Sequence, residues 1–170
     1  MEIKEFTNKI LPIKDKLFRF SFRILGNMQE AEDVVQEVFI KLWNKRLDIT
    51  DLNNVDAFCM TMTKNLSLDK LRSKHKRVVA MPDNYDAPLV EANPLQQTVH
   101  NDTLNRVASI MNQLPENQKL VMQLRDIEEY SYKEIVALLK MSLDQVKVNL
   151  FRARKTVRSK LINSEEYGLQ

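Results

Sequence analysis

The sequence predicts an all-α protein in which two small helical domains are joined by a flexible linker, the C-terminal domain being a helix-turn-helix. Apolar residues recur at helical spacing in both halves, and no stretch alternates at period two as a half-buried strand would. The 170 residues include only two glycines, too few for a phosphate-cradling loop or a dinucleotide-binding turn. Residues 78–101 hold three prolines, three acids and no Lys or Arg. Prolines at that spacing forbid a long helix, so we expect domains at 1–77 and 102–170 with an acidic linker between them.

The first domain begins with two helices separated by a glycine. Pro12 suits a first helical turn, and Gly26 suits a helix end. The apolar residues between them recur at helical spacing: Phe18, Phe22 and Leu25. Asn27 and Glu30 then cap a second helix that runs to about Asn44.

This second helix has two contrasting faces. One face is apolar and should be core: Ala31, Val34, Val35, Val38, Phe39 and Leu42. The far side carries acids and amides around Ile40, with Trp43 at its edge: Gln29, Asp33, Gln36 and Glu37. An isolated exposed Ile is usually unremarkable, whereas an Ile rimmed by acids and an amide also suits protein docking. The residues alone leave both interpretations open.

A third helix is expected from Val55 or Asp56 to the basic run 70–77, after a polar loop at 48–54. Asn65, Asp69 and Arg72 share one stripe of this helix. The Asp–Arg pair can be an ordinary surface ion pair. The neighbouring Lys and Arg residues of the run 70–77 instead favour a role in contacting phosphates. The side chains that can reach a nucleic acid there are Thr61, Lys64 and Asn65, with Phe58 packed beside them.

The second domain contains two helix-start signatures eleven residues apart. A helix with Leu104, Val107, Ile110 and Met111 is followed by one that begins at Pro115. Ser131 with Glu134, and Ser142 with Gln145, then form two capping boxes. Because the helix between them is too short to stand alone, this spacing is typical of a helix-turn-helix.

The last helix separates an apolar stripe from a basic face. The stripe should be buried: Val146, Leu150, Ala153, Val157 and Leu161. Between residues 143 and 162 six Lys or Arg residues stand against Asp144 alone. A solvated basic face on an ordinary bundle helix is the simpler interpretation, but the second helix of a helix-turn-helix normally meets DNA. We therefore expect the basic residues to meet phosphates and the residues near the helix start to meet base edges.

Composition excludes several other classes of protein. The single cysteine, Cys59, rules out an internal disulfide and a multi-cysteine zinc site. His75 and His100 lie far apart, and the chain shows no catalytic cluster, so we expect neither an enzyme nor a bound cofactor or metal. No apolar run approaches about 20 residues and no signal-peptide core is present, so we expect a soluble, cytoplasmic protein without membrane insertion.

Four segments, taken together, resemble the extracytoplasmic-function (ECF) group of bacterial RNA polymerase sigma factors. In chain order they are QEAEDVVQEVFIKLW, KNLSLDKLRSKHKR, LPENQKLVMQLRDIEEYSYKEIVALL and VKVNLFRARKTVRSKL. They occur in the family's order and at its separations, and the resemblance extends from Leu17 to Leu161.

The resemblance implies a transcription initiation factor that binds core RNA polymerase and promoter DNA and directs strand opening. Polymerase would be bound by Asp33, Gln36, Glu37 and Ile40. The minus-ten element would be recognised and opened by the loop 48–54 and by Thr61, Lys64, Asn65, Arg72, Lys74, Lys76 and Arg77. The minus-thirty-five element would be read by Ser142, Asp144, Gln145, Lys147, Val148, Asn149, Phe151, Arg152, Arg154, Lys155 and Arg158. The family often has an anti-sigma partner, so one is an expected regulator.

The chain departs from the family pattern at three places. Lys140 stands where a glycine is usual, so the turn must close without the residue that most easily adopts a left-handed conformation. Val148 and Asn149 replace a Ser-Arg pair, and Cys59–Met60 replaces a Trp-Leu pair. Two other functions stay open from the residues: a stand-alone helix-turn-helix repressor or activator, and a helical adaptor whose basic faces bind acidic proteins.

Overall fold

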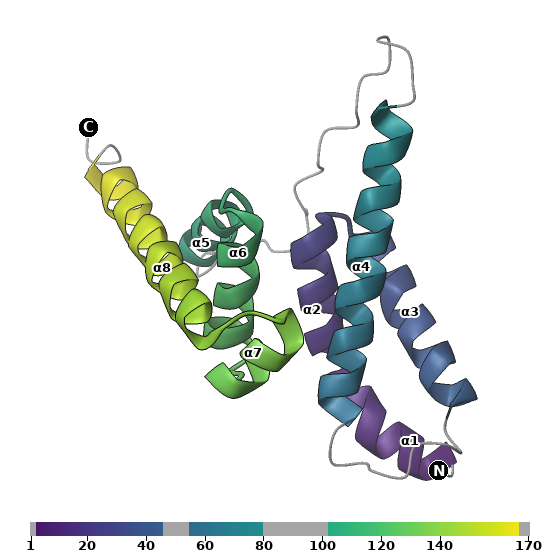
Figure 1. Cartoon of the computed structure of the whole chain (residues 1–170). Coiled ribbons are helices and arrows are strands. Elements are labelled where there is room, and N and C mark those ends of the chain that lie inside the picture. Colours follow the sequence, from purple (N-terminus) through teal and green to yellow (C-terminus); the bar gives the residue numbers. More distant parts are fainter. Residues whose placement is uncertain (1–2, 46–54, 80–101, 167–170) are drawn as a thin grey trace. The chain divides into compact units, whose positions relative to one another are not determined.

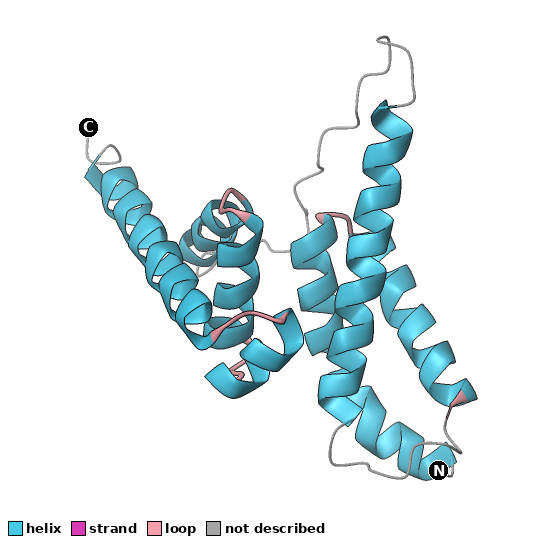
Figure 2. Cartoon of the chain, viewed as in Figure 1, coloured by secondary structure: helices cyan, strands magenta, loops and turns pink. Residues whose placement is uncertain are grey.

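The computed structural model describes residues 3–45, 55–79 and 102–166 (Figure 1). Every regular element in these ranges is helical, which confirms the all-α prediction (Figure 2). The chain divides into two compact units, Met1–Ala92 and Asn93–Gln170. Of the expected linker, residues 80–101 lie outside the described ranges, while Val78 and Val79 continue the preceding helix.

The first unit packs α2 (Lys14–Leu25), α3 (Met28–Asn44) and α4 (Val55–Val79) around one apolar core. It also contains α1 (Ile3–Ile10), which was not predicted from the sequence, and a 3-10 turn (Leu11–Ile13). Fully buried core residues include Leu17, Phe20, Val34, Val38, Leu42 and Met60. One buried hydrogen bond joins α2 to α4, between the hydroxyl oxygens of Ser21 and Ser67 at 2.9 Å.

The junction between α2 and α3 follows the sequence prediction. Gly26 adopts the left-handed conformation with φ 67°, and its N–H donates to the Phe22 carbonyl. The Asn27 side-chain oxygen then accepts from the backbone N–H of Glu30 at 2.9 Å. These two contacts satisfy backbone groups that each helix end would otherwise leave without partners.

The described residues of the second unit, 102–166, form four α-helices, as expected: α5 (Asp102–Asn112), α6 (Glu116–Met122), α7 (Tyr132–Leu139) and α8 (Leu143–Glu166). A π-helical turn, Gln123–Ile127, extends α6, and helical periodicity does not predict it. Within this segment the buried Gln123 amide donates to the Glu128 carboxylate at 3.0 Å. Arg125 donates to the Tyr130 carbonyl at 2.8 Å, which holds the chain close to the start of α7.

Both predicted capping boxes are present. Ser131 accepts from the Glu134 N–H, and the Glu134 carboxylate accepts from the Ser131 N–H at 2.7 Å. At the start of α8, Ser142 and Gln145 make the same two bonds at 3.1 Å and 2.9 Å. The helix-turn-helix therefore has a well-bonded entry at each helix. Its turn closes at Lys140, which is itself left-handed with φ 54° and ψ 44°.

Candidate functional site

The face of α8 turned away from the core carries most of the residues expected to read the minus-thirty-five element. The expected stripe beneath them is confirmed, since Val146, Leu150, Ala153 and Val157 are buried and Leu161 is half-buried. The exposed members of the predicted set are Ser142, Asp144, Gln145, Lys147, Val148, Phe151, Arg152, Arg154, Lys155 and Arg158. Because they share one exposed surface, they could meet a single partner together.

Two amides on this face already make internal hydrogen bonds. The Gln145 side-chain oxygen is used in the capping box, where it accepts from the Ser142 N–H. The half-buried Asn149 amide donates to the backbone carbonyl of Gln145 at 2.8 Å. Gln145 therefore has one lone pair fewer, and Asn149 one N–H fewer, to offer to another molecule.

Arg154 is bound within the domain. Its Nε and Nη2 groups both donate to the Asp126 carboxylate, the Nε bond measuring 3.0 Å. These hydrogen bonds raise the pKa of the Arg154 guanidinium. Arg154 was expected to contact phosphate, and the pair with Asp126 was not predicted because Asp126 lies 28 residues earlier in the chain.

A groove of about 640 Å³ runs along the flank of α8 beside Tyr132. Four cationic side chains line it, together with the apolar Phe151 and Ile162: Lys147, Arg154, Lys155 and Arg158. Arg125 lies 5.0 Å from the centre of the Tyr132 ring in a cation–π contact. The lining of the groove thus combines positively charged and apolar side chains.

The outward face of α3 has the predicted mixture of polar residues around an aliphatic one. Ile40 is 60% exposed, Asp33 and Gln36 are exposed, and Glu37 is half-buried. Glu37 accepts from Lys41 at 2.8 Å, one helical turn away. Ala31, Val34, Val35, Val38 and Leu42 on the other side are buried as expected, and Phe39 is half-buried.

The residues of α4 expected at the minus-ten element differ in exposure. Asn65, Arg72, Lys74 and Lys76 are exposed, and the expected Asp69–Arg72 ion pair is present at 3.6 Å. Thr61 is half-buried and donates to the Ala57 carbonyl.

Lys64 departs from the expectation that it lies on the surface. It is only 9% exposed, because it lies on the side of α4 that packs within the unit. The Arg77 side chain and the loop 48–54 lie outside the described residues.

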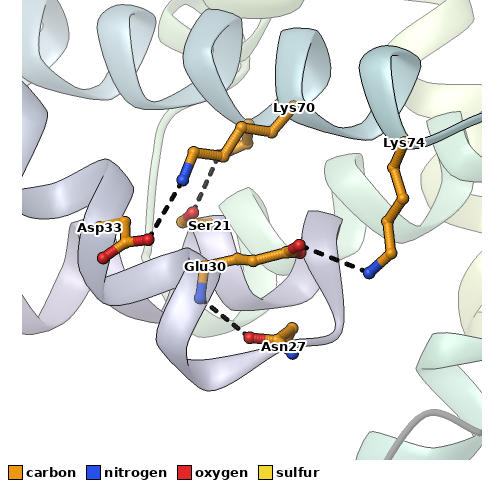
Figure 3. A network of polar contacts seen from close by, with 7 residues as sticks. Ser21, Asn27, Glu30, Asp33, Lys70 and Lys74 are labelled. Atoms are coloured by element: carbon orange, nitrogen blue, oxygen red, sulfur yellow. Dashed lines mark hydrogen bonds and ion pairs between the residues drawn. The ribbon is translucent and has the colours of Figure 1, made fainter. Parts of the chain in front are cut away.

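Two ion pairs link α3, which carries the predicted polymerase surface, to α4, which carries the predicted minus-ten surface (Figure 3). Lys70 lies 3.5 Å from the Asp33 carboxylate, and Lys74 lies 3.5 Å from that of Glu30. One Glu30 oxygen is buried without a hydrogen-bond partner. The partners are 37 and 44 residues apart in sequence, so only the packing of α3 on α4 brings them together.

Among the described residues no group of three or more His, Cys, Asp or Glu side chains could hold a metal ion. None of the helices in those ranges is both long enough and apolar enough to span a membrane.

Family comparisons match both units. Residues 12–77 match the model of Sigma-70 region 2, and residues 104–157 match that of Sigma-70, region 4. The fold is similar to the sigma factor RpoE of Bartonella quintana, solved in complex with the anti-sigma factor NepR. That likeness has a TM-score of 0.76 at 20% identity and covers 94% of this chain and 98% of RpoE, and at this identity it shows the fold alone.

Similar curated proteins indicate which group of sigma factors the chain resembles. The chain is 31% identical over 150 residues to the ECF RNA polymerase sigma factor SigE of Mycolicibacterium smegmatis, covering 86% of this chain and 58% of SigE. It is 29% identical over 164 residues to the ECF RNA polymerase sigma factor SigW of Bacillus subtilis, covering 87% of this chain and 84% of SigW. The two regions place the protein in the sigma-70 class. Within that class, the chain belongs to the ECF group of RNA polymerase sigma factors.

Proposed function

We propose that this chain is a cytoplasmic transcription initiation factor that binds core RNA polymerase and directs it to promoters with specific minus-ten and minus-thirty-five elements. Residues 1–77 would bind polymerase and open the minus-ten element, and residues 102–170 would read the minus-thirty-five element as duplex. The observation that carries the proposal is the exposed basic face of α8. This helix is the second helix of a helix-turn-helix in which both helices begin with a capping box, and the same chain contains a sigma region 2 unit.

The charge and shape of α8 support a role in duplex recognition. A helix entering the major groove needs cations along its flanks for phosphates and shorter or flat side chains near its start for bases. Lys155 and Arg158 lie along the flank, while Gln145, Val148 and Arg152 lie in the first three turns. An Arg at such a position can donate two hydrogen bonds to guanine.

The outward face of α3 supports a protein contact. Ile40 offers apolar area at the centre of a ring of polar groups, an arrangement typical of interaction surfaces. We assign Asp33, Gln36 and Glu37 to this ring, with polymerase as the partner. Asp33 is already paired with Lys70, so an ion pair between Asp33 and polymerase would replace the Asp33–Lys70 pair.

The exposed stripe of α4 supports contact with an opened strand. Asn65 can donate and accept at once, which suits an unpaired base. Arg72, Lys74 and Lys76 add positive charge beyond it. Lys64 is assigned a structural role because it is buried. The similar RpoE was solved in complex with the anti-sigma factor NepR, and an anti-sigma protein is a proposed partner here as well.

Reconstituted run-off transcription tests the proposal. Core polymerase alone should give no product from a promoter selected out of a randomised library, and addition of this chain should give a product with one defined start. A stand-alone repressor would instead bind the duplex without polymerase and leave core polymerase inactive. Equal transcription from selected and scrambled promoters would contradict the proposal.

A further inference from the structure

Two large apolar side chains project from the DNA-reading face of α8. Val148 is 45% exposed and Phe151 is 67% exposed, whereas Val146 and Leu150, which alternate with them along the helix, are 0% and 3% exposed. Residues three apart on a helix are neighbours, so Val148 and Phe151 form one apolar patch. This patch faces away from the core of its own unit.

Two polar side chains beside the patch, Gln145 and Asn149, already make hydrogen bonds within α8 and its cap. Gln145 has its side-chain oxygen bound to the Ser142 N–H, and Asn149 has its amide bound to the Gln145 carbonyl. An amide selects adenine by donating and accepting at once, and each of these amides already uses one lone pair or one N–H in an internal bond. Apolar contact is the form of recognition that the exposed Val148 and Phe151 themselves can offer.

The C5-methyl of thymine is the apolar group that base pairs display in the major groove. We propose that Val148 and Phe151 select thymine in the upstream promoter element by covering its methyl group. This inference rests on the proposed function of α8 as the helix that reads the duplex. Arg152 lies one turn beyond Val148 on the same exposed face, so a guanine is expected next to the selected thymine.

Replacement of thymine by deoxyuridine tests the proposal, because it removes the methyl group and leaves base pairing intact. The upstream element is first selected from a randomised library with polymerase holoenzyme containing the full chain. Each thymine in the selected element is then replaced singly by deoxyuridine, and the affinity of the holoenzyme is measured by competition. Loss of one covered methyl group should weaken binding about four-fold, the factor expected for one buried methylene-sized group.

Side-chain variants identify the residue responsible. Val148→Ala and Phe151→Ala are tested separately. Each variant should bind thymine and deoxyuridine equally at the one position where the parent side chain covers the methyl group. Leu104→Ala is the matched control, since Leu104 is an equally exposed apolar residue, 65% exposed, on α5 of the same unit. That control should keep the full four-fold difference. Circular dichroism confirms that each variant is folded.

The possible outcomes separate the thymine proposal from the function on which it rests. A parent holoenzyme that selects an upstream motif but binds deoxyuridine as well as thymine overturns the thymine proposal alone. A holoenzyme that selects no upstream motif overturns the role of α8 in reading as well. If Phe151→Ala weakens binding to polymerase and leaves the deoxyuridine effect unchanged, the patch is a protein contact and the proposal is wrong.

Discussion

Lys140 holds a backbone conformation that favours glycine. A left-handed conformation costs a residue with a Cβ about 1 kcal/mol, whereas glycine adopts it freely. Lys140→Gly should therefore stabilise the C-terminal unit by about 0.5–1 kcal/mol, despite the greater freedom of glycine in the unfolded chain. Urea unfolding followed by circular dichroism measures the change.

Lys133 supplies the matched control for that substitution. It is exposed and lies inside α7, where the backbone is α-helical. Lys133→Gly should destabilise the unit by about 1 kcal/mol, since glycine is a poor helix former. Equal effects of the two glycines would show that the left-handed turn carries no cost.

Cys59 makes the stability of the first unit depend on pH in the alkaline range. Burial raises the pKa of the Cys59 thiol to about 12, and the charge of Asp56 adds to the effect. The folded state thus favours the neutral thiol, and the unfolded chain gains stability once its thiol ionises above a pKa of 9.0. The free energy of unfolding should be constant up to about pH 8.5 and fall between pH 9 and 12.

Comparison of the parent with Cys59→Ala isolates this contribution. The alanine variant leaves a small cavity and should be less stable at pH 7, but its loss of stability above pH 9 should be shallower. Thiol reagents should modify the parent at pH 8 only after unfolding. Parallel pH curves for the two proteins would argue against a buried, neutral Cys59.

The α3 helix should lose polymerase binding without losing its fold when its outward face is made basic. Gln36 and Ile40 are exposed while the opposite face fills the core. The double substitution Gln36→Lys with Ile40→Lys should therefore leave the circular dichroism spectrum unchanged and reduce retention on immobilised core polymerase at least ten-fold, equivalent to about 1.4 kcal/mol.

A matched pair elsewhere controls for the added charge. Asn8 and Leu11, at the end of α1 and in the following turn, are also an exposed amide and an exposed aliphatic residue. Asn8→Lys with Leu11→Lys adds the same two charges and should retain binding. Full retention by the α3 variant would remove α3 from the proposed polymerase contact.

The α4 helix should be needed for opening through Asn65. Asn65→Ala should keep polymerase binding and upstream recognition but form fewer open complexes, because an unpaired base loses its partner. Permanganate footprinting measures the opening. A template already mismatched across the minus-ten element removes a pairing cost of a few kcal/mol and should rescue most of the defect. Normal opening of intact duplex by the variant would leave Asn65 a structural residue.

The parts of the fold that were predictable from the sequence are those fixed by residues close together in the chain. Gly26 and Asn27 set a helix end and a helix start within two positions, and the serines at 131 and 142 open their helices as expected. The buried stripe of α8 follows from a repeat of three and four residues. In each case the interaction that decides the structure spans four residues or fewer.

The features that escaped prediction depend on packing between distant segments. The Arg154–Asp126 and Lys70–Asp33 pairs join residues 28 and 37 positions apart, and nothing in the local sequence selects those partners. Lys64 was expected to reach a nucleic acid, yet the packing of α4 leaves it only 9% exposed. The π-helical turn after α6 is a local exception: it spans the buried Gln123–Glu128 contact, and helical periodicity does not predict it.

The ion pairs between α3 and α4 also bear on the thermodynamics of DNA binding. Cationic residues bind DNA largely because they release small cations condensed on the phosphates, and that release makes affinity fall as salt rises. Lys70 and Lys74 already hold Asp33 and Glu30 as tethered counter-charges, so their approach would free fewer ions than two unpaired lysines. Asp33→Asn with Glu30→Gln should accordingly steepen the salt dependence of single-stranded DNA binding by the full chain, by up to about 1.4 in the logarithmic slope. The affinity of the first unit for an opened strand would thus fall less steeply with rising salt than it would if both lysines were unpaired.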